Sequence, residues 1–189
     1  RVAVQYLNYH SGSPHHLVYL DEVKKATVKT VPEIGNKFYI EFTTKDYESN
    51  ETGTCTAAIF YHTAYGPAVH VNCSSSRSLK KAREDDYNFY VWYLAIMGSS
   101  FAMWKETFEG RSYTMAQIKN VKQLLRKDDY ISFDYDILLH ELPTEEMVSC
   151  NLHVVWIPGR PPKVDYHCTH KLENGSGTEP EEGSTFLGN

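Results

Sequence analysis

The four cysteines of the chain form two pairs with identical spacing. The position numbers differ by 73 − 55 = 18 for Cys55 and Cys73, and by 168 − 150 = 18 for Cys150 and Cys168. A spacing that recurs in both halves of a chain indicates an internal duplication. The sequence therefore predicts two copies of one small module.

Each cysteine pair encloses the same turn signal. Pro67 follows Cys55 at an offset of 67 − 55 = 12, and Pro162 follows Cys150 at an offset of 162 − 150 = 12. Apolar and polar residues alternate on both sides of each turn, as in a β-hairpin with one buried face. The apolar ones are Ala57, Ile59, Tyr61, Val69 and Val71 in the first copy, and Leu152, Val154, Trp156, Val164 and Tyr166 in the second. Each cysteine pair would then close one hairpin.

Two disulfides, Cys55–Cys73 and Cys150–Cys168, best explain this pattern. Closing a loop of this size stabilises a fold by about 3 kcal/mol on a chain-entropy estimate, which matters for a module with a small core. Four buried reduced thiols or a zinc site are the alternatives, but zinc sites use closely spaced cysteines and the chain has no Cys-x-x-Cys. Three N-glycosylation sequons, which begin at Asn50, Asn72 and Asn174, fit an oxidising compartment.

A matched strand precedes each cysteine pair. We align Tyr39–Phe42 with Tyr130–Phe133. The segment Tyr130–His140 alternates so regularly that one face is apolar and the other polar, as in an antiparallel sheet covered on a single side. Further strands are predicted over Leu17–Thr27 and Tyr113–Leu125.

One helix should cover each sheet. The segment Val91–Glu106 is apolar nearly all round, which indicates a buried helix, and the opening segment up to Tyr9 has apolar residues at helical spacing. A helix followed by four strands thus occurs twice, which predicts an α+β fold of tandem modules, each one helix packed on a curved four-stranded antiparallel sheet. We assign residues 1–90 to the first module, 91–168 to the second, and 169–189 to a flexible acidic tail rich in Gly, Ser and Glu.

Charge and hydropathy exclude two classes of partner. The chain has 19 basic and 24 acidic residues and a net charge of -5, whereas nucleic-acid-binding proteins need clustered Lys and Arg. The most apolar segment, residues 91–104, is interrupted by Gly98 and is shorter than a membrane-spanning helix. We therefore expect neither nucleic acid nor membrane as a partner. The chain opens on Arg1, and we interpret it as a mature or trimmed product.

No motif indicates catalysis. His140-Glu141 begins like the zinc-binding helix of a metalloprotease, but Thr144 stands where the second histidine would be. His15 and His16 are adjacent and would point to opposite faces of a strand. The sequence contains no nucleophile elbow, phosphate-binding loop or dinucleotide fingerprint. We therefore expect no catalytic residues, no metal site and no cofactor, and interpret the chain as a binding protein rather than an enzyme.

Several longer segments carry a resemblance to a known family. They are Tyr6–Tyr9, Gly98–Trp104, Lys127–Asp129, Phe133–Tyr135, Leu138–Leu142, Val154–Gly159, Tyr166–Cys168 and Gly177–Glu179. Over nearly its whole length the chain resembles the latexin and retinoic acid receptor responder family of duplicated cystatin-like proteins, and within it is similar to matrix proteins of the avian eggshell. Related proteins have a linker helix between the segments matching Tyr90 and Val91. Here these residues are joined directly, and we hypothesise that a connector is missing.

The resemblance implies a secreted, extracellular protein that inhibits a zinc carboxypeptidase with a rigid loop. The loop maps to Pro143, Thr144, Glu145, Glu146, Met147 and Val148. Latexin has Gln where this chain has Glu145, and a carboxylate there could ligate a zinc ion. An ordinary acidic hairpin turn is the alternative interpretation of the same residues.

A structural matrix protein without protease inhibition is the alternative function. The resemblance to eggshell proteins implies a mineralisation-modulating or antimicrobial role, with a calcium carbonate surface or other matrix proteins as partners. The carboxylates of the tail that could contact mineral are Glu173, Glu179, Glu181 and Glu182. A solvated acidic tail is the simpler explanation of these charges.

Overall fold

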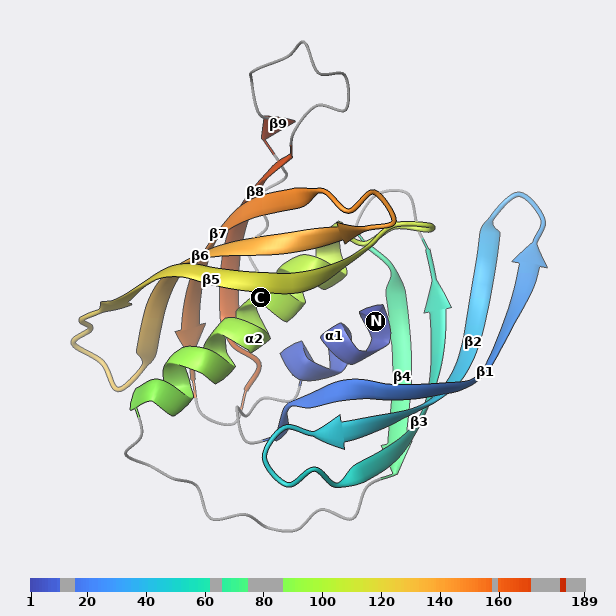
Figure 1. Cartoon of the computed structure of the whole chain (residues 1–189), viewed down its shortest axis with the longest axis horizontal. Coiled ribbons are helices and arrows are strands. Elements are labelled where there is room, and N and C mark those ends of the chain that lie inside the picture. Colours follow the sequence, from blue (N-terminus) through green and yellow to red (C-terminus); the bar gives the residue numbers. More distant parts are fainter. Residues whose placement is uncertain (11–15, 62–65, 75–86, 158–159, 171–180, 183–189) are drawn as a thin grey trace.

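The computed structural model describes residues 1–10, 16–61, 66–74, 87–157, 160–170 and 181–182. The first half consists of helix α1 (Val2–His10) and strands β1 (Val18–Val31), β2 (Gly35–Asp46), β3 (Thr52–Phe60) and β4 (Ala68–Ser74). The second half consists of helix α2 (Tyr87–Glu106) and strands β5 (Ser112–Leu124), β6 (Ile131–Leu142), β7 (Met147–Trp156), β8 (Lys163–His170) and β9 (Glu181–Glu182). The order of one helix and four strands therefore occurs twice, with the short β9 added at the end (Figure 1).

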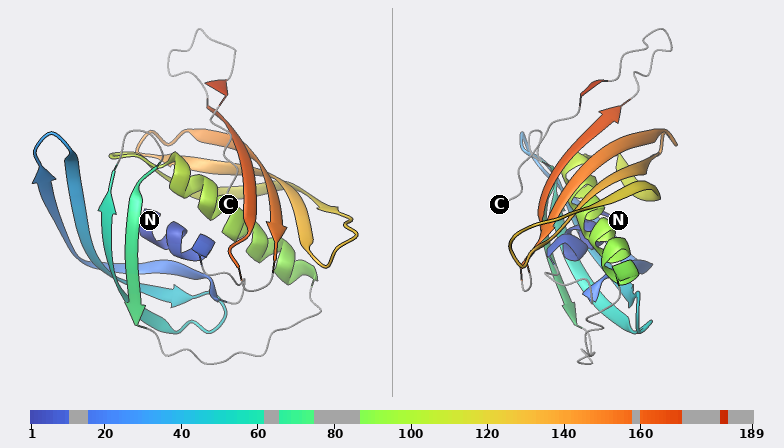
Figure 2. Two further views of the ribbon diagram at one scale, coloured as in Figure 1. Left: turned by 180° about the vertical axis from the view of Figure 1, so that it is seen from behind. Right: turned by 90° about the vertical axis from the view of Figure 1, so that its left-hand side faces the viewer.

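Each half forms its own antiparallel sheet with the strands in chain order. One sheet has the order β1-β2-β3-β4 and the other β5-β6-β7-β8-β9. α1 buries apolar side chains against the first sheet and α2 against the second, and the two helices lie side by side between the sheets (Figures 1 and 2). The predicted fold class, tandem cystatin-like modules with one helix on a curved antiparallel sheet, is confirmed.

Both disulfides are present, and they join directly opposite residues of the last hairpin in each module. Cys55 of β3 is bonded to Cys73 of β4, and Cys150 of β7 is bonded to Cys168 of β8. The chain therefore ties the same two strands together in each sheet.

The two modules match at a constant offset of 150 − 55 = 95 in residue number. The β1–β2 pair has bulges at Leu20/Glu22 and Val23/Lys25, and the β5–β6 pair has bulges at Met115/Gln117 and Ile118/Asn120. Each bulge of the second pair follows its counterpart in the first by this same offset. Because bulges bend a strand and increase its local twist, the two sheets bend at corresponding positions.

This offset corrects one match made from the sequence. The alignment of Tyr39–Phe42 with Tyr130–Phe133 is wrong, because Phe42 pairs with Cys55 whereas the residue paired with Cys150 is Ile137. The true counterpart of the first segment is therefore 134–137. Alternating apolar residues fit more than one alignment, and only the hydrogen-bond ladder to the cysteine strand fixes the register.

The boundary expected between residues 90 and 91 falls near the start of helix α2. α2 begins at Tyr87 and runs through Tyr90 and Val91 without a break, so the expected boundary falls inside a helix. The segment that links β4 to α2, residues 75–86, lies outside the described residues. At the other end, Thr169 and His170 belong to β8 and pair with β9, rather than to the tail. Most of the expected flexible tail also lies outside the described residues.

The modules touch through their helices. Tyr6 of α1 packs edge-to-face on Trp104 of α2 with ring centroids 4.9 Å apart. The Trp104 indole Nε1 donates a hydrogen bond to the Pro67 carbonyl of the first module at 2.8 Å. Buried Gln5 of α1 donates from Nε2 to the Tyr113 carbonyl of β5 at 2.6 Å. Polar and aromatic contacts therefore cross the boundary at several points.

Within the part of the chain that the structure describes, neither helix is long and apolar enough to cross a bilayer.

Candidate functional site

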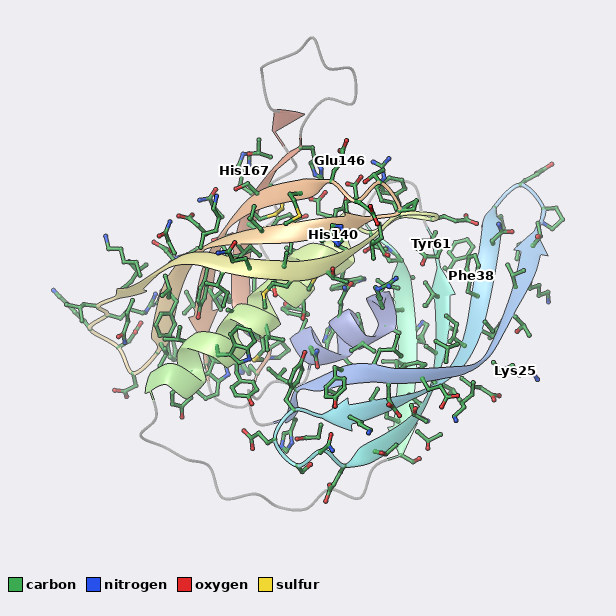
Figure 3. The ribbon with its side chains drawn as sticks, viewed as in Figure 1. Lys25, Phe38, Tyr61, His140, Glu146 and His167 are labelled. Carbon is green, nitrogen blue, oxygen red and sulfur yellow. A yellow bond between two sulfur atoms is a disulfide. The ribbon has the colours of Figure 1, made fainter. Side chains whose placement is uncertain are left out.

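The candidate loop connects β6 to β7 and has a defined backbone path. The Glu141 amide donates to the Glu146 carbonyl at 2.8 Å, and the Glu145 amide donates to the Glu141 carbonyl at 2.8 Å. Glu145 has a φ of 63°, in the left-handed region. Of the six predicted residues, Pro143, Thr144 and Glu145 are exposed and Glu146 is half-buried. The predicted loop is two residues too long, because exposed Met147 and buried Val148 already belong to β7. Figure 3 shows Glu146 at this end of the second sheet.

A buried carboxylate anchors the base of this loop. Glu141 is the last inward-facing residue of β6 and is 2% exposed. Its Oε1 accepts a hydrogen bond from the Thr144 hydroxyl at 2.7 Å, and its Oε2 accepts one from the Tyr113 hydroxyl at 2.9 Å. The Arg111 Nε lies 3.3 Å from Glu141 Oε1. A buried carboxylate needs such partners, and one of them, Thr144, belongs to the exposed loop itself.

A second carboxylate and a histidine extend this cluster. His170 of β8 places its Nε2 3.5 Å from Glu106 Oε2 and its Nδ1 3.9 Å from Glu141 Oε2. The hydrogen bond to Glu106 and the two carboxylate charges raise the pKa of His170 above its ordinary value, against the opposing effect of burial. Burial, followed by the hydrogen bond to Glu141, raises the pKa of the Tyr113 hydroxyl well beyond its ordinary value. Tyr113 therefore remains a neutral donor.

The dipeptide His140-Glu141 does not form a metal site. Neighbouring strand residues point to opposite faces, so Glu141 enters the core while half-buried His140 lies on the outer face of the sheet. Among the described residues, no group of three His, Cys, Asp or Glu side chains is placed to hold a metal ion.

The candidate loop has a counterpart of the same shape in the first module. In residues 46–51, the Asp46 amide donates to the Glu51 carbonyl at 3.0 Å and the Asn50 amide donates to the Asp46 carbonyl at 2.9 Å. Asn50 has a φ of 60°. The anchoring differs, because Asp46 Oδ1 accepts from the amides of Glu48 and Ser49 within its own loop, at 2.8 and 2.9 Å. The loop of the second module is instead anchored by the hydrogen bond from Thr144 to the buried Glu141 carboxylate.

The turn between α2 and β5 links the anchor to the first module. The Arg111 guanidinium lies 4.9 Å from the ring centre of exposed Phe108. In the same turn, Glu109 Oε1 accepts a hydrogen bond from Asn36 Nδ2 of β2 at 2.7 Å. Burial, and then the charge of Glu109, raise the pKa of Tyr61, which lies beside Phe38 in the first sheet (Figure 3). The turn that carries Arg111 is therefore hydrogen-bonded to the first module.

Sequence reasoning did not identify the anchor. Glu141 lies on the same inward face of β6 as Tyr135, Ile137 and Leu139. A carboxylate on this otherwise apolar face was the one sequence signal that could have indicated a buried charge. Its partners Arg111, Tyr113 and His170 come from a turn and two other strands, so no local pattern connects them.

The predicted glycosylation residues fall in three different settings. Asn50 is exposed in the loop between β2 and β3, and Asn72 is exposed on β4 beside Cys73. Asn174 lies outside the described residues.

Comparison with known proteins agrees with the duplicated architecture. A family model described as Latexin matches residues 1–91 and again residues 90–174. Ovocalyxin-32 of Gallus gallus is 35% identical over an alignment that covers 94% of this chain and 76% of that protein. Retinoic acid receptor responder protein 1 of Homo sapiens is 34% identical, with 99% and 76% covered. Latexin of Mus musculus is 28% identical, with 88% and 89% covered.

Proposed function

Because the chain belongs to the latexin family, we propose that it is an extracellular, non-enzymatic protein that inhibits a zinc carboxypeptidase through the loop Pro143–Val148. The observation that carries this proposal is the combination of an exposed loop and a buried anchor. Thr144 is exposed, yet its hydroxyl is bound to a carboxylate that is 2% exposed. The extracellular location is supported by the two disulfides, which persist in oxidising compartments.

A loop held in this way is suited to block an enzyme. Binding loses less conformational entropy when the inserted loop is already ordered, and the two backbone hydrogen bonds and the Glu141 anchor order this one. Exposed Glu145 is the residue that projects from the left-handed corner of the loop. Zinc accepts carboxylate oxygens as ligands, so the target's metal would compensate for burying the Glu145 charge, which otherwise costs several kcal/mol.

The direct test is an inhibition assay of the full chain against a pancreatic-type zinc carboxypeptidase. We expect inhibition by the wild type, and we expect Glu145→Ala to raise the inhibition constant at least tenfold. The matched control is Asn50→Ala, which changes the same backbone position in the loop of the first module and should leave inhibition unchanged. Glu145→Gln separates the roles of charge and shape, because it keeps the size of the side chain but not the carboxylate.

The absence of inhibition at micromolar protein would refute this proposal. Equal effects of Glu145→Ala and Asn50→Ala would instead show that the assay reports general destabilisation and not contact through the second loop.

A matrix role in the avian eggshell is the second candidate function. The observation that favours it is the 35% identity to ovocalyxin-32 over 94% of this chain. In this proposal the acidic tail contacts calcium carbonate. The test is calcite binding by a chain truncated after His170, because β8 extends to that residue and an earlier cut would remove part of the Glu141 cluster. Unchanged binding would remove the tail's role.

A further inference from the structure

The sequon that begins at Asn50 lies in an exposed and well-defined loop. Asn50, Glu51 and Thr52 are all exposed, at the point where the β2–β3 connection enters β3. The loop is closed by backbone hydrogen bonds between Asp46 and Glu51 and between Asn50 and Asp46. The three residues that an oligosaccharide-transferring enzyme reads are therefore on the surface, and the acceptor residue lies at the corner of the turn.

The Asn50 side chain is oriented by a tyrosine. The Tyr19 hydroxyl donates a hydrogen bond to Asn50 Oδ1 at 3.2 Å. N-glycosylation takes place on the other branch of the amide, the nitrogen Nδ2, and a glycosylated asparagine keeps its oxygen as an acceptor. The contact with Tyr19 is therefore compatible with the modified side chain and fixes the direction in which a sugar would leave it.

Tyrosine rings form an exposed surface beside this residue. Tyr19 is 37% exposed and Tyr47 is 42% exposed, with ring centroids 5.2 Å apart. Tyr93 of α2 lies next to Tyr47 with ring centroids 6.4 Å apart. Tyrosine is enriched at interfaces, because it offers an apolar ring face together with a polar tip. The C–H face and the hydroxyls of a pyranose match both.

We propose that Asn50 carries an N-linked glycan whose first sugars lie on the rings of Tyr19 and Tyr47. The inference rests on the extracellular location proposed above, because glycan transfer takes place in the secretory pathway. The donor is a lipid-pyrophosphate-linked oligosaccharide. Asn50 Nδ2 forms a bond to C1 of the first sugar and loses one proton, while the bond from C1 to the phosphate oxygen breaks and the lipid pyrophosphate leaves with the electron pair.

The duplication gives this glycan a consequence for recognition. The equivalent position of the second module is Glu145, which cannot accept a glycan. One of two loops of the same shape would then be covered by sugar and the other left open. The sequon at Asn72 has a different setting, on the regular strand β4, where its side chain lines a shallow depression of about 330 Å³ with Tyr39 and His70.

The test is to secrete the full chain from mammalian cells behind a signal sequence and to analyse each sequon by mass spectrometry. After reduction, chymotrypsin releases a peptide of residues 48–60 that contains Asn50 and neither other sequon. We expect a glycan mass on this peptide, and conversion of Asn50 to aspartate by peptide N-glycosidase. Thr52→Ala should abolish the glycan and the matched Thr52→Ser should retain it. An unmodified peptide in secreted wild-type protein would overturn the proposal.

The contact with the tyrosines has its own readout. Enzymatic removal of the glycan should lower the Tm of the wild type, and the decrease should be smaller in Tyr47→Ala. An equal decrease in both proteins would refute packing on the tyrosines, while the peptide mass still reports attachment. Carboxypeptidase inhibition by Thr52→Ala, assayed separately, should equal that of the wild type. If neither the wild type nor Thr52→Ala inhibits the carboxypeptidase, the result would count against the proposed function and not against the glycan.

Discussion

Asn50 and Glu145 occupy the same left-handed backbone position, one in each module. Their φ angles are 60° and 63°, and each donates its amide to the carbonyl four residues earlier. The loop path is therefore common to both modules, whereas the side chain at its corner differs. An asparagine tolerates this conformation better than a glutamate, because its short polar side chain forms local hydrogen bonds.

The first prediction is that Glu145→Asn stabilises the protein. Moving from glutamate to asparagine at a positive φ should relieve part of a backbone cost of about 1 kcal/mol. Urea unfolding should show the free energy of unfolding rising by roughly 0.5–1 kcal/mol on this basis. The reciprocal substitution Asn50→Glu should lower it. A loss of stability in Glu145→Asn would show that the carboxylate makes a stabilising contact in the free protein.

The second prediction concerns the hydroxyl that Tyr113 donates to Glu141. Tyr113→Phe leaves a buried carboxylate with one donor fewer, and hydrogen bonds to charged groups contribute about 1.5–3 kcal/mol. We expect a decrease of about 2 kcal/mol in the free energy of unfolding. The control is Tyr130→Phe, since Tyr130 is 41% exposed at the far end of the second sheet. Similar decreases in both variants would argue against a special role for the cluster.

The third prediction is a pH dependence set by His170. Its folded-state pKa is raised, chiefly by the hydrogen bond to Glu106, so the protonated form is favoured in the folded protein. This contribution is fully present below the unfolded pKa, about 6.5, and is lost as the pH rises through the raised folded pKa. The difference in unfolding free energy between wild type and His170→Gln should therefore shrink as pH increases.

His10 provides a control of opposite sign. Burial, and then the charge of Lys105, lower the pKa of His10, so its neutral form is favoured in the folded protein. Its contribution is present above the unfolded pKa and is lost as the pH falls. His10→Gln should thus differ from the wild type in the opposite pH direction. A difference between wild type and His170→Gln that is independent of pH would contradict the third prediction.

The fourth prediction is that Gly98→Ala destabilises α2 packing although alanine is the better helix former. Alanine gains about 1 kcal/mol over glycine in a helix interior. A Cβ at this position would lie 2.6 Å from Val154 Cγ2 and 3.4 Å from Leu152 Cδ1. Valine is stiff at χ1, and overpacking costs about 1–3 kcal/mol. We expect a net loss of about 1 kcal/mol in the free energy of unfolding.

A double-mutant cycle checks this explanation. Val154→Ala should lower the free energy of unfolding less in the Gly98→Ala background than in the wild type. In that background the valine methyl group clashes with the Cβ added at position 98, and the substitution removes the clash. Additive effects would show that the two positions do not compete for space.

The repeat and its disulfides could be predicted from the sequence, because the cysteine and proline spacings are independent of each other and agree. Strand alternation also placed β6 close to its true bounds. The register between the modules could not be predicted in the same way. The short alternating segment at Tyr39 matches several alternating segments, and the hydrogen-bond partner of Phe42 decides which is correct.

The candidate loop was found through the family resemblance, whereas its anchor was not. Glu141 lies directly before the predicted loop, but the residues that hold it are distant in sequence. Arg111 precedes β5, Tyr113 is the second residue of β5, and His170 ends β8. Their convergence depends on the antiparallel pairing of four strands in the order β5-β6-β7-β8, which brings these residues to one end of the sheet.

The contacts that each helix makes with the other module determine how the protein unfolds. The Gln5 side chain of the first module donates a hydrogen bond to the backbone of β5 in the second. The Trp104 indole of the second module donates one to the Pro67 carbonyl of the first. Unfolding of either module would leave these groups of the other without partners and expose the faces of both helices. We therefore expect one cooperative transition in calorimetry, in which the two modules unfold together as a single thermodynamic unit and not as two independent domains.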